Sequence, residues 1–327
     1  MASTIIPLSE NLPGRVSWKT NLSKIAPKFE AMGLKERILE TQFRYLFIGA
    51  PALRFSGIIL HQMLLRKTCS NSKESKEIKF LLNGEEVSFG MREYALVTGL
   101  NFGLFPDLNE EEEECPPLVV KYFKGNMLIR VSDLESSFLA CPDKEDSWKM
   151  GLVLLVCQYL FSLDPRKFVN TKILSMVEDL DTFLQFPWGK VSFRATLKGI
   201  NRDMKHHRQA YLSKNRATPP VYNVYGFALA FQVWIYEIIK AFVPKFAERV
   251  EQRETFCPRI LLYTSMKTNT VPQICAALND CVVTAMEESD EEKKLYNGAE
   301  FEHMTDKFDE FFERELRKRK HEEEEEE

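Results

Sequence analysis

A run of cations between Arg194 and Arg216 holds the side chains best suited to chemistry with another macromolecule. The one acid in this run is Asp203. Clustered Lys and Arg side chains neutralise phosphates, so the run predicts a nucleic-acid-binding face. The candidate residues are Arg194, Lys198, Arg202, Lys205, Arg208, Lys214 and Arg216.

The same run also fits a basic amphipathic helix over 192–212 whose charged face is simply solvated. Its apolar residues recur at the three- and four-residue spacing of a helix that packs on a core. Basic helix faces are common, and no groove-binding motif accompanies this one. The apolar positions are Phe193, Leu197, Ile200, Met204 and Tyr211.

His206 and His207 lie inside the basic run and are the first residues to test for metal ligation. Neighbouring helix positions point about 100° apart, so the two imidazoles do not chelate one ion together. No Cys or acid stands at ligand spacing from either residue. We therefore expect no metal site.

Cys281 follows Asp280 and has Gln273 upstream, an order resembling the nucleophile region of ubiquitin-like-protein proteases. Those enzymes have Gly after the nucleophile, whereas this chain has Val282, and the Trp-flanked His with its acid partner is missing upstream. A catalytic thiolate needs a nearby base to lower its pKa. Phosphate-binding loops, nucleophile elbows and zinc-protease motifs are also missing. We expect no catalytic residue, no cofactor and no enzyme activity.

The formal net charge of −4 conceals a basic body, because two runs of glutamates, 110–114 and 322–327, carry much of the negative charge. Such runs are usually solvated, and a mildly basic body permits an acidic partner. The basic cluster Arg317, Lys318, Arg319 and Lys320 fits a nuclear import signal. It also fits a helix C-terminus whose cations favour the helix dipole.

Hydrophobic periodicity predicts a mainly α protein with one small β-hairpin. The hairpin spans 78–89 around Asn83-Gly84, a pair that accepts positive φ at both positions, and a helix over 91–98 follows, bounded by Gly90 and Gly99. Helices are further expected over 32–47, 55–66, 132–140, 150–163, 172–184, 225–242 and 272–286. A last helix carries an apolar stripe that should dock on the body or on a partner helix: Phe301, Met304, Phe308, Phe311, Phe312 and Leu316.

The segments 150–163 and 225–242 are heavily apolar but shorter than the roughly 20 residues that span a bilayer. We expect both to be core helices, contributing Leu154, Leu155, Tyr159, Phe227, Leu229, Trp234 and Ile238. The N-terminus lacks the pattern of a secretory signal, and the seven cysteines are scattered. An intracellular protein without membrane insertion is therefore expected.

Four blocks, in this order, resemble a plant-specific domain of unknown function. They are FSGIILHQMLLR from Phe55, KFLLNGEEVSFGMREYALVTGLNFG from Lys79, FPWGKVSFRATLKGI from Phe186 and YGFALAFQVWIYEIIK from Tyr225. That domain occurs at the N-terminus of proteins encoded by Mutator-like transposable elements, many of which continue into a ubiquitin-like-protease domain. One departure is Gly90-Met91, where the family more often has Ser-Leu. No protease motif follows here, and the resemblance supplies no catalytic residue.

The combined expectation is a mainly α, multi-helix globular domain with a helical C-terminal extension. We assign 1–30 to a loose N-terminal segment, 31–245 to the domain of unknown function, 246–321 to the helical extension and 322–327 to an acidic tail. The resemblance implies a transposon-derived plant protein acting in the nucleus as a non-catalytic protein-interaction module. The alternative is nucleic-acid binding through the Arg194–Arg216 run.

Overall fold

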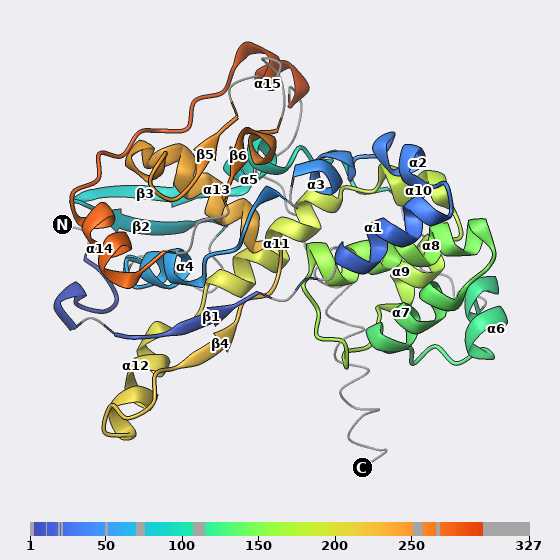
Figure 1. Ribbon diagram of the computed structural model, residues 1–327, viewed down its shortest axis with the longest axis horizontal. Helices are drawn as coiled ribbons and strands as arrows, with labels where there is room; N and C mark the ends of the chain where they lie inside the picture. The colour runs from blue at the N-terminus through green and yellow to red at the C-terminus, as the bar shows by residue number, and fades with distance from the viewer. Residues whose placement is uncertain are drawn as a thin grey trace.

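Helices dominate the computed structural model, and the small sheets gather at one end of the molecule (Figure 1). The structure describes residues 3–10, 12–18, 20, 22–49, 52–69, 76–106, 115–250, 258–265 and 269–296. The prediction of a mainly α fold with a small hairpin and further C-terminal helices is confirmed. No helix within the described ranges has the length and apolar character needed to cross a lipid bilayer.

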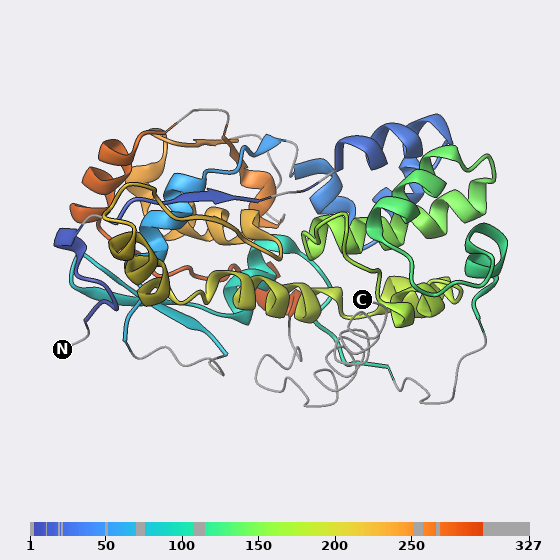
Figure 2. The ribbon, with the colours of Figure 1, turned by 90° about the horizontal axis from the view of Figure 1, so that it is seen from below.

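One group of elements, on the right of Figure 1, consists of helices. It contains α1 (Leu22–Ala31), α2 (Lys35–Leu39), α6 (Pro117–Phe123), α7 (Val131–Ala140), α8 (Lys144–Leu154), α9 (Thr171–Met176) and α10 (Leu180–Gln185). A π-helical turn over Leu155–Leu160 extends α8. The short helix α3 (Arg44–Gly49) lies between this group and the sheets, and α11 (Trp188–Ile200) extends from the group toward the sheets (Figure 2).

The second group combines helices with three two-stranded sheets among the described residues. Its helices are α4 (Gly57–Leu64), α5 (Met91–Thr98), α12 (Met204–Ser213), α13 (Ala228–Ile238), α14 (Val271–Asn279) and α15 (Asp290–Leu295). In one sheet, β1 (Arg15–Ser17) runs parallel to β4 (Val221–Asn223). The other two sheets are antiparallel. One pairs β2 (Ile78–Leu82) with β3 (Glu85–Phe89), and the other pairs β5 (Glu248–Arg249) with β6 (Tyr263–Thr264).

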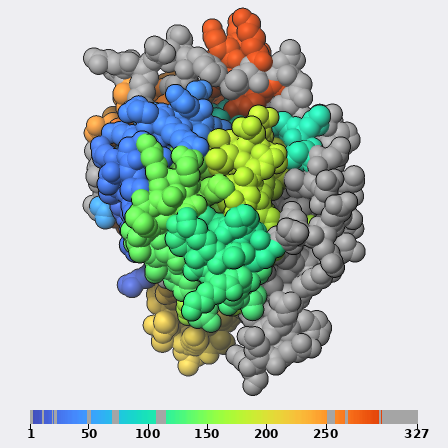
Figure 3. All heavy atoms as spheres, turned by 90° about the vertical axis from the view of Figure 1, so that its right-hand side faces the viewer, coloured from blue at the N-terminus to red at the C-terminus, as the bar shows by residue number. Residues whose placement is uncertain are grey.

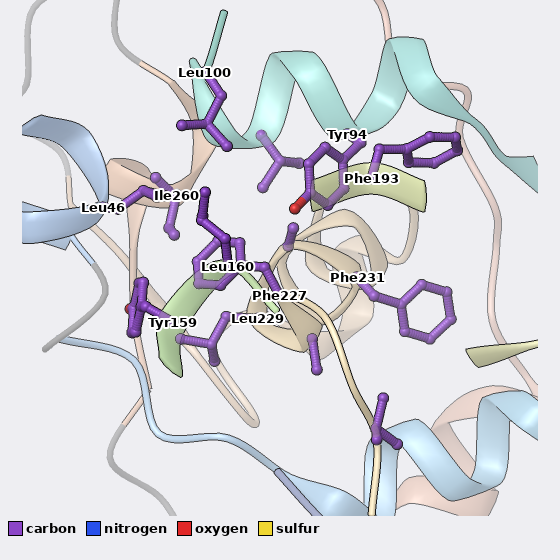
Figure 4. Close-up of a cluster of buried hydrophobic side chains, with 14 of the residues drawn as sticks. Leu46, Tyr94, Leu100, Tyr159, Leu160, Phe193, Phe227, Leu229, Phe231 and Ile260 are labelled. Carbon is purple, nitrogen blue, oxygen red and sulfur yellow. The ribbon is translucent and has the colours of Figure 1, made fainter. Parts of the chain in front are cut away.

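The core predicted from the two apolar segments is confirmed. All seven expected residues are buried, including Trp234, which is 1% exposed. The rings of Phe80 and Phe89 from the hairpin lie 5.7 and 5.1 Å from the ring of Trp234. Figure 4 shows how Tyr159, Phe227 and other core side chains converge from separate helices.

The hairpin also forms as predicted. Leu82 pairs with Glu85, and the turn residues Asn83 and Gly84 have φ values of 47° and 88°. Helix α5 begins at Met91, where the Glu93 side chain accepts a hydrogen bond from the backbone N–H of Gly90. It ends at Gly99, whose φ of 65° lies in the left-handed region.

Three helices predicted as continuous are each divided in two in the structure. The expected helix over 192–212 is two helices, α11 and α12, and the expected helix over 172–184 is α9 and α10. The expected helix over 32–47 is likewise divided between α2 and α3. Asp179 and Asp203 mark the starts of α10 and α12, because each side chain caps the helix that follows it.

Part of the N-terminal segment expected to be loose forms β1 and α1. Local periodicity does not reveal β1, because its partner β4 lies about two hundred residues further along the chain. Helix α7 begins at Val131, one residue before the predicted start, and no side-chain hydrogen bond caps it. There the N–H groups of Val131 and Ser132 donate instead to the carbonyls of Lys167 and Pro165.

Polar contacts attach the described C-terminal elements to the body. Arg259 forms ion pairs with Glu237 of α13 and Glu292 of α15, both at 2.7 Å. The hydroxyl of Tyr296 donates to the carbonyl of Ala95 in α5 at 2.8 Å. The apolar stripe from Phe301 to Leu316, the cluster Arg317–Lys320 and both glutamate runs lie outside the described residues.

We expect Gly84→Val to reduce the free energy of unfolding by about 1–2 kcal/mol, because a β-branched residue resists positive φ. A Cβ at this position would meet no atom within 4 Å, so the cost is conformational rather than steric. Urea denaturation of Gly84→Asn is the control, since Asn tolerates the left-handed region. Equal losses in the two variants would contradict this explanation.

Candidate functional site

The cationic run lies on α11, on α12 and on the loop that joins α12 to β4. Close packing of α11 on residues 225–226 sets its position. A Cβ on Gly199 would lie 2.2 Å from the carbonyl oxygen of Tyr225. Gly226 has a φ of 78°, and a Cβ there would lie 2.3 Å from the Cα of Thr196. Larger residues do not fit at either glycine, so the chain after α12 is held against α11.

A buried lysine supports the break between α11 and α12. Lys67 is 2% exposed, and its ammonium donates to the side-chain oxygen of Asn201 at 2.8 Å and to the carbonyl of Arg202 at 2.9 Å. Burial lowers the pKa of Lys67 to about 8. Asp203 then accepts hydrogen bonds from the N–H groups of Lys205 and His206 and starts α12. These contacts turn the chain and divide the predicted basic face.

Arg202 and Arg208, from the predicted cations, are engaged inside the molecule. The Arg202 guanidinium donates to the carbonyl of Asn223 and lies over the Tyr222 ring at 5.2 Å from its centroid. Arg208 forms a bidentate ion pair with Glu10, whose pKa falls below its usual value because of that hydrogen bond. Both side chains therefore attach this region to the body.

The remaining cations of the run divide into two sets. Arg194 is half-buried, and Lys198 is exposed near the C-terminus of α11. Lys205, Lys214 and Arg216 are exposed on α12 and the loop after it. No Asp or Glu occurs between Asp203 and Glu237 in the sequence. The structure therefore presents cations along α12 and its loop with no acid from this part of the chain among them.

The loop after α12 has an unusual backbone. Asn215 and Arg216 both have positive φ, at 49° and 59°. Asn accepts this conformation at a helix C-terminus, but for Arg it costs free energy. The N–H of Arg216 donates to the carbonyl of Tyr211 and closes the end of the helix. The segment projects from the body beside β4 in Figure 1, and its gold atoms lie at the bottom of Figure 3.

Large apolar side chains are exposed among these cations. Leu212, Val221 and Tyr225 are 37%, 68% and 43% exposed. We call the exposed side chains between Lys205 and Tyr225 the α12–β4 surface. It combines cations with apolar groups rather than presenting cations only.

A cluster formed by His61, Tyr222 and His207, called the histidine hub, lies beneath this surface. His61 of α4 is 2% exposed, and its Nε2 lies 2.8 Å from the carbonyl oxygen of Leu12 while its Nδ1 lies 2.8 Å from the Tyr222 hydroxyl. A carbonyl only accepts hydrogen bonds, so Nε2 carries the proton and Nδ1 accepts from Tyr222. The His207 ring stacks on Tyr222 at 4.7 Å. The hub joins the N-terminal segment, α4, β4 and α12.

The paired histidines of the sequence have different environments. His206 is exposed, while His207 packs on Tyr222. Among the described residues, no three His, Cys, Asp or Glu side chains come together as metal ligands. Cys281 is buried, and burial raises the pKa of its thiol. This environment is the opposite of the one that activates a nucleophilic cysteine.

Sequence reasoning missed His61, Lys67, Tyr222 and Glu10. Each is an ordinary residue in its own segment, and each gains its role from a partner more than a hundred residues away. A possible signal was the pair Arg66-Lys67, two cations directly after an apolar helix, which require polar partners if they are buried.

Comparison with known proteins adds one finding. Residues 65–199 match the model of a family described as a domain of unknown function, DUF1985. No curated protein and no solved structure matches the chain.

The DUF1985 match covers less than half of the chain. It contains the β-hairpin, α5 and all of α11 except Ile200. The family description assigns no activity. Helix α12 and β4 lie beyond the match, so the α12–β4 surface is interpreted from its own geometry.

Protonation of His61 should destabilise the fold. Burial lowers its pKa below the ordinary value of 6.5, so below that pH the unfolded chain binds a proton that the folded chain rejects. Stability is therefore complete above pH 6.5 and falls as the pH decreases. We expect the Tm of the wild type to fall more steeply between pH 7 and 5 than that of His61→Gln. His206→Gln, at an exposed site, should follow the wild type; identical slopes for all three proteins would contradict the role of the hub.

Proposed function

We propose that this protein is a non-catalytic module that binds another protein through the α12–β4 surface. The observation that carries the proposal is the exposure of Leu212, Val221 and Tyr225 among cations. Protein interfaces are enriched in aromatic and Arg side chains and bury apolar groups at their centre. The hub and the Arg208 ion pair hold this surface in place, which limits the conformational entropy lost on binding.

The buried Cys281 supports a role without catalysis. Its thiol donates to the carbonyl of Leu278 at 3.3 Å, and burial raises its pKa. Both features favour the thiol over the reactive thiolate. A cysteine protease is therefore the least supported of the functions considered.

Nucleic-acid binding is the second candidate. Lys198, Lys205, Lys214 and Arg216 are exposed, and no acid follows Asp203 until Glu237. The exposed ring of Tyr225 offers a platform on which a base can stack. This candidate ranks second because Arg202 and Arg208 are engaged within the protein.

The finer proposal is a transposon-derived plant protein that acts in the nucleus. Its support is the resemblance of the four sequence blocks, together with the cluster Arg317–Lys320. The DUF1985 match is compatible with this proposal but carries no information on origin or compartment.

Protein binding is tested with two exposed leucines on helices. We expect Leu212→Asp to weaken capture of partner proteins by about tenfold, because it replaces an apolar contact by a charge that must lose its hydration at the centre of the interface. Leu139→Asp is the matched control, since Leu139 of α7 is 42% exposed but lies elsewhere. Quantitative mass spectrometry compares the proteins that the two variants retain. Equal retention would exclude the α12–β4 surface as the interface.

Nucleic-acid binding is tested by a salt titration with duplex DNA and single-stranded RNA. If the second candidate holds, Lys205→Ala, Lys214→Ala and Arg216→Ala together should reduce the slope of log K against log salt by about 2 to 3, since each phosphate contact contributes about 0.9 on duplex DNA and about 0.7 on a single strand. The control changes Lys124, Lys144 and Lys245, which are exposed outside this surface. Equal slopes for both triple variants would exclude this site for nucleic acid.

Nuclear import is tested with a fluorescent fusion. Replacing Arg317, Lys318, Arg319 and Lys320 by Ala should lower the nuclear fraction in plant cells, because import receptors bind clustered cations. Replacing 322–327 by Gln is the control, since it changes neighbouring charge without touching the cluster. An unchanged nuclear fraction in the first variant would refute the import signal.

A further inference from the structure

The strand β4 has one partner and one free edge within the part of the chain that the structure describes. The N–H of Arg15 donates to the carbonyl of Pro220, and the N–H of Val224 donates to the carbonyl of Ser17. In a parallel pair, alternate residues bond to the neighbouring strand. Tyr222 is thus the residue that bonds to β1, while the peptide groups of Val221 and Asn223 point away from it.

Among the described residues, three backbone groups on this edge have no hydrogen-bond partner. The carbonyl of Asn223 already accepts from Arg202, which leaves both groups of Val221 and the N–H of Asn223. Val221 is 68% exposed, so the edge is open to solvent at this residue. In Figure 1, β4 lies at the lower rim of the molecule, with β1 above it and α12 beside it. An unpaired edge of this kind is a template for another strand.

The strand is rigid and its surroundings are cationic. Tyr222 is buried between His61 and His207, which fixes the backbone of β4 before any partner arrives. The residue paired with Val221 is the exposed Arg15, and Lys214 and Arg216 lie on the loop that leads into β4. No acid occurs in 204–236, and Glu10, which lies beside α12, is paired with Arg208; the exposed cations Arg15, Lys214 and Arg216 therefore complement an acidic chain.

We propose that the free edge of β4 binds an extended acidic peptide segment of a partner protein as an added strand. This inference rests on the proposed protein-binding function and specifies the partner's chemistry. Backbone hydrogen bonds to Val221 and Asn223 align the peptide, and its carboxylates meet Arg15, Lys214 and Arg216. The apolar side chain of Val221 packs against alternate side chains of the added strand.

The probe is a fluorescent peptide of alternating Glu and Val, about ten residues long, measured by anisotropy at about 0.15 M salt. We expect saturable binding, and binding weaker by about tenfold for the same peptide with every backbone nitrogen methylated, which keeps the charge but loses all N–H donors. A peptide of alternating Lys and Val should not bind. Equal affinity for the two acidic peptides would overturn the proposal, because charge without strand pairing would then explain binding.

On the protein side, Val221→Pro removes an outward N–H while keeping the ladder to β1, and proline is tolerated on strand edges. We expect Val221→Pro to weaken binding of the Glu-Val peptide by about tenfold. Val221→Thr should keep the affinity within about twofold of the wild type, and thermal melts verify that both variants are folded. Displacement of the peptide by duplex DNA, with equal DNA affinity for wild type and Val221→Pro, would identify nucleic acid as the occupant and overturn the proposal. If Leu212→Asp loses captured proteins while no acidic peptide binds, protein binding stands and the strand-edge mode fails.

Discussion

Complete burial of α13 is the constraint on which the rest of this structure depends. Every residue of the helix except Glu237 is buried, and a helix that is apolar all round must be covered on all sides. The aromatic rings of Phe80 and Phe89, from the β-hairpin, cover one side of the helix. The rings of Tyr159 and Trp18 pack against Phe227, the residue just before the helix. The few polar groups of α13 are satisfied in turn: Gln232 binds the backbone of 54–56, and Glu237 pairs with Arg259.

Covering α13 brings together segments that are far apart in sequence, and the α12–β4 surface is a by-product of that assembly. Gly226, two residues before α13, packs closely against α11, so α12 and its loop extend outward between two packed helices. The returning chain forms β4, and the N-terminal strand β1 closes over it. The core is therefore insensitive to the surface residues of this excursion, and they are free to serve binding.

Tertiary contacts, rather than position along a helix, determine which cations between α11 and α13 are engaged within the protein and which are exposed. Arg202 lies between α11 and α12 and Arg208 lies on α12, both within a few residues of the exposed Lys205. One reaches Asn223 and Tyr222, and the other reaches Glu10. Their engagement converts a predicted phosphate-binding stripe into a smaller mixed surface. The experiments on Leu212, Val221 and the exposed cations measure how that surface is used.

Local chemistry in the sequence was sufficient for the Asn83-Gly84 hairpin, for α5 with its Gly99 terminus and for the burial of Trp234, because each depends on neighbours within a few residues or on strong hydrophobicity. The division of 192–212 into α11 and α12, the pairing of β1 with β4 and the histidine hub were decided by tertiary structure. Lys67, His61 and Glu10 act on residues more than a hundred positions away. A short polar segment gains too little free energy from local interactions to select one conformation, so the partner that buries it or pairs with it makes the choice.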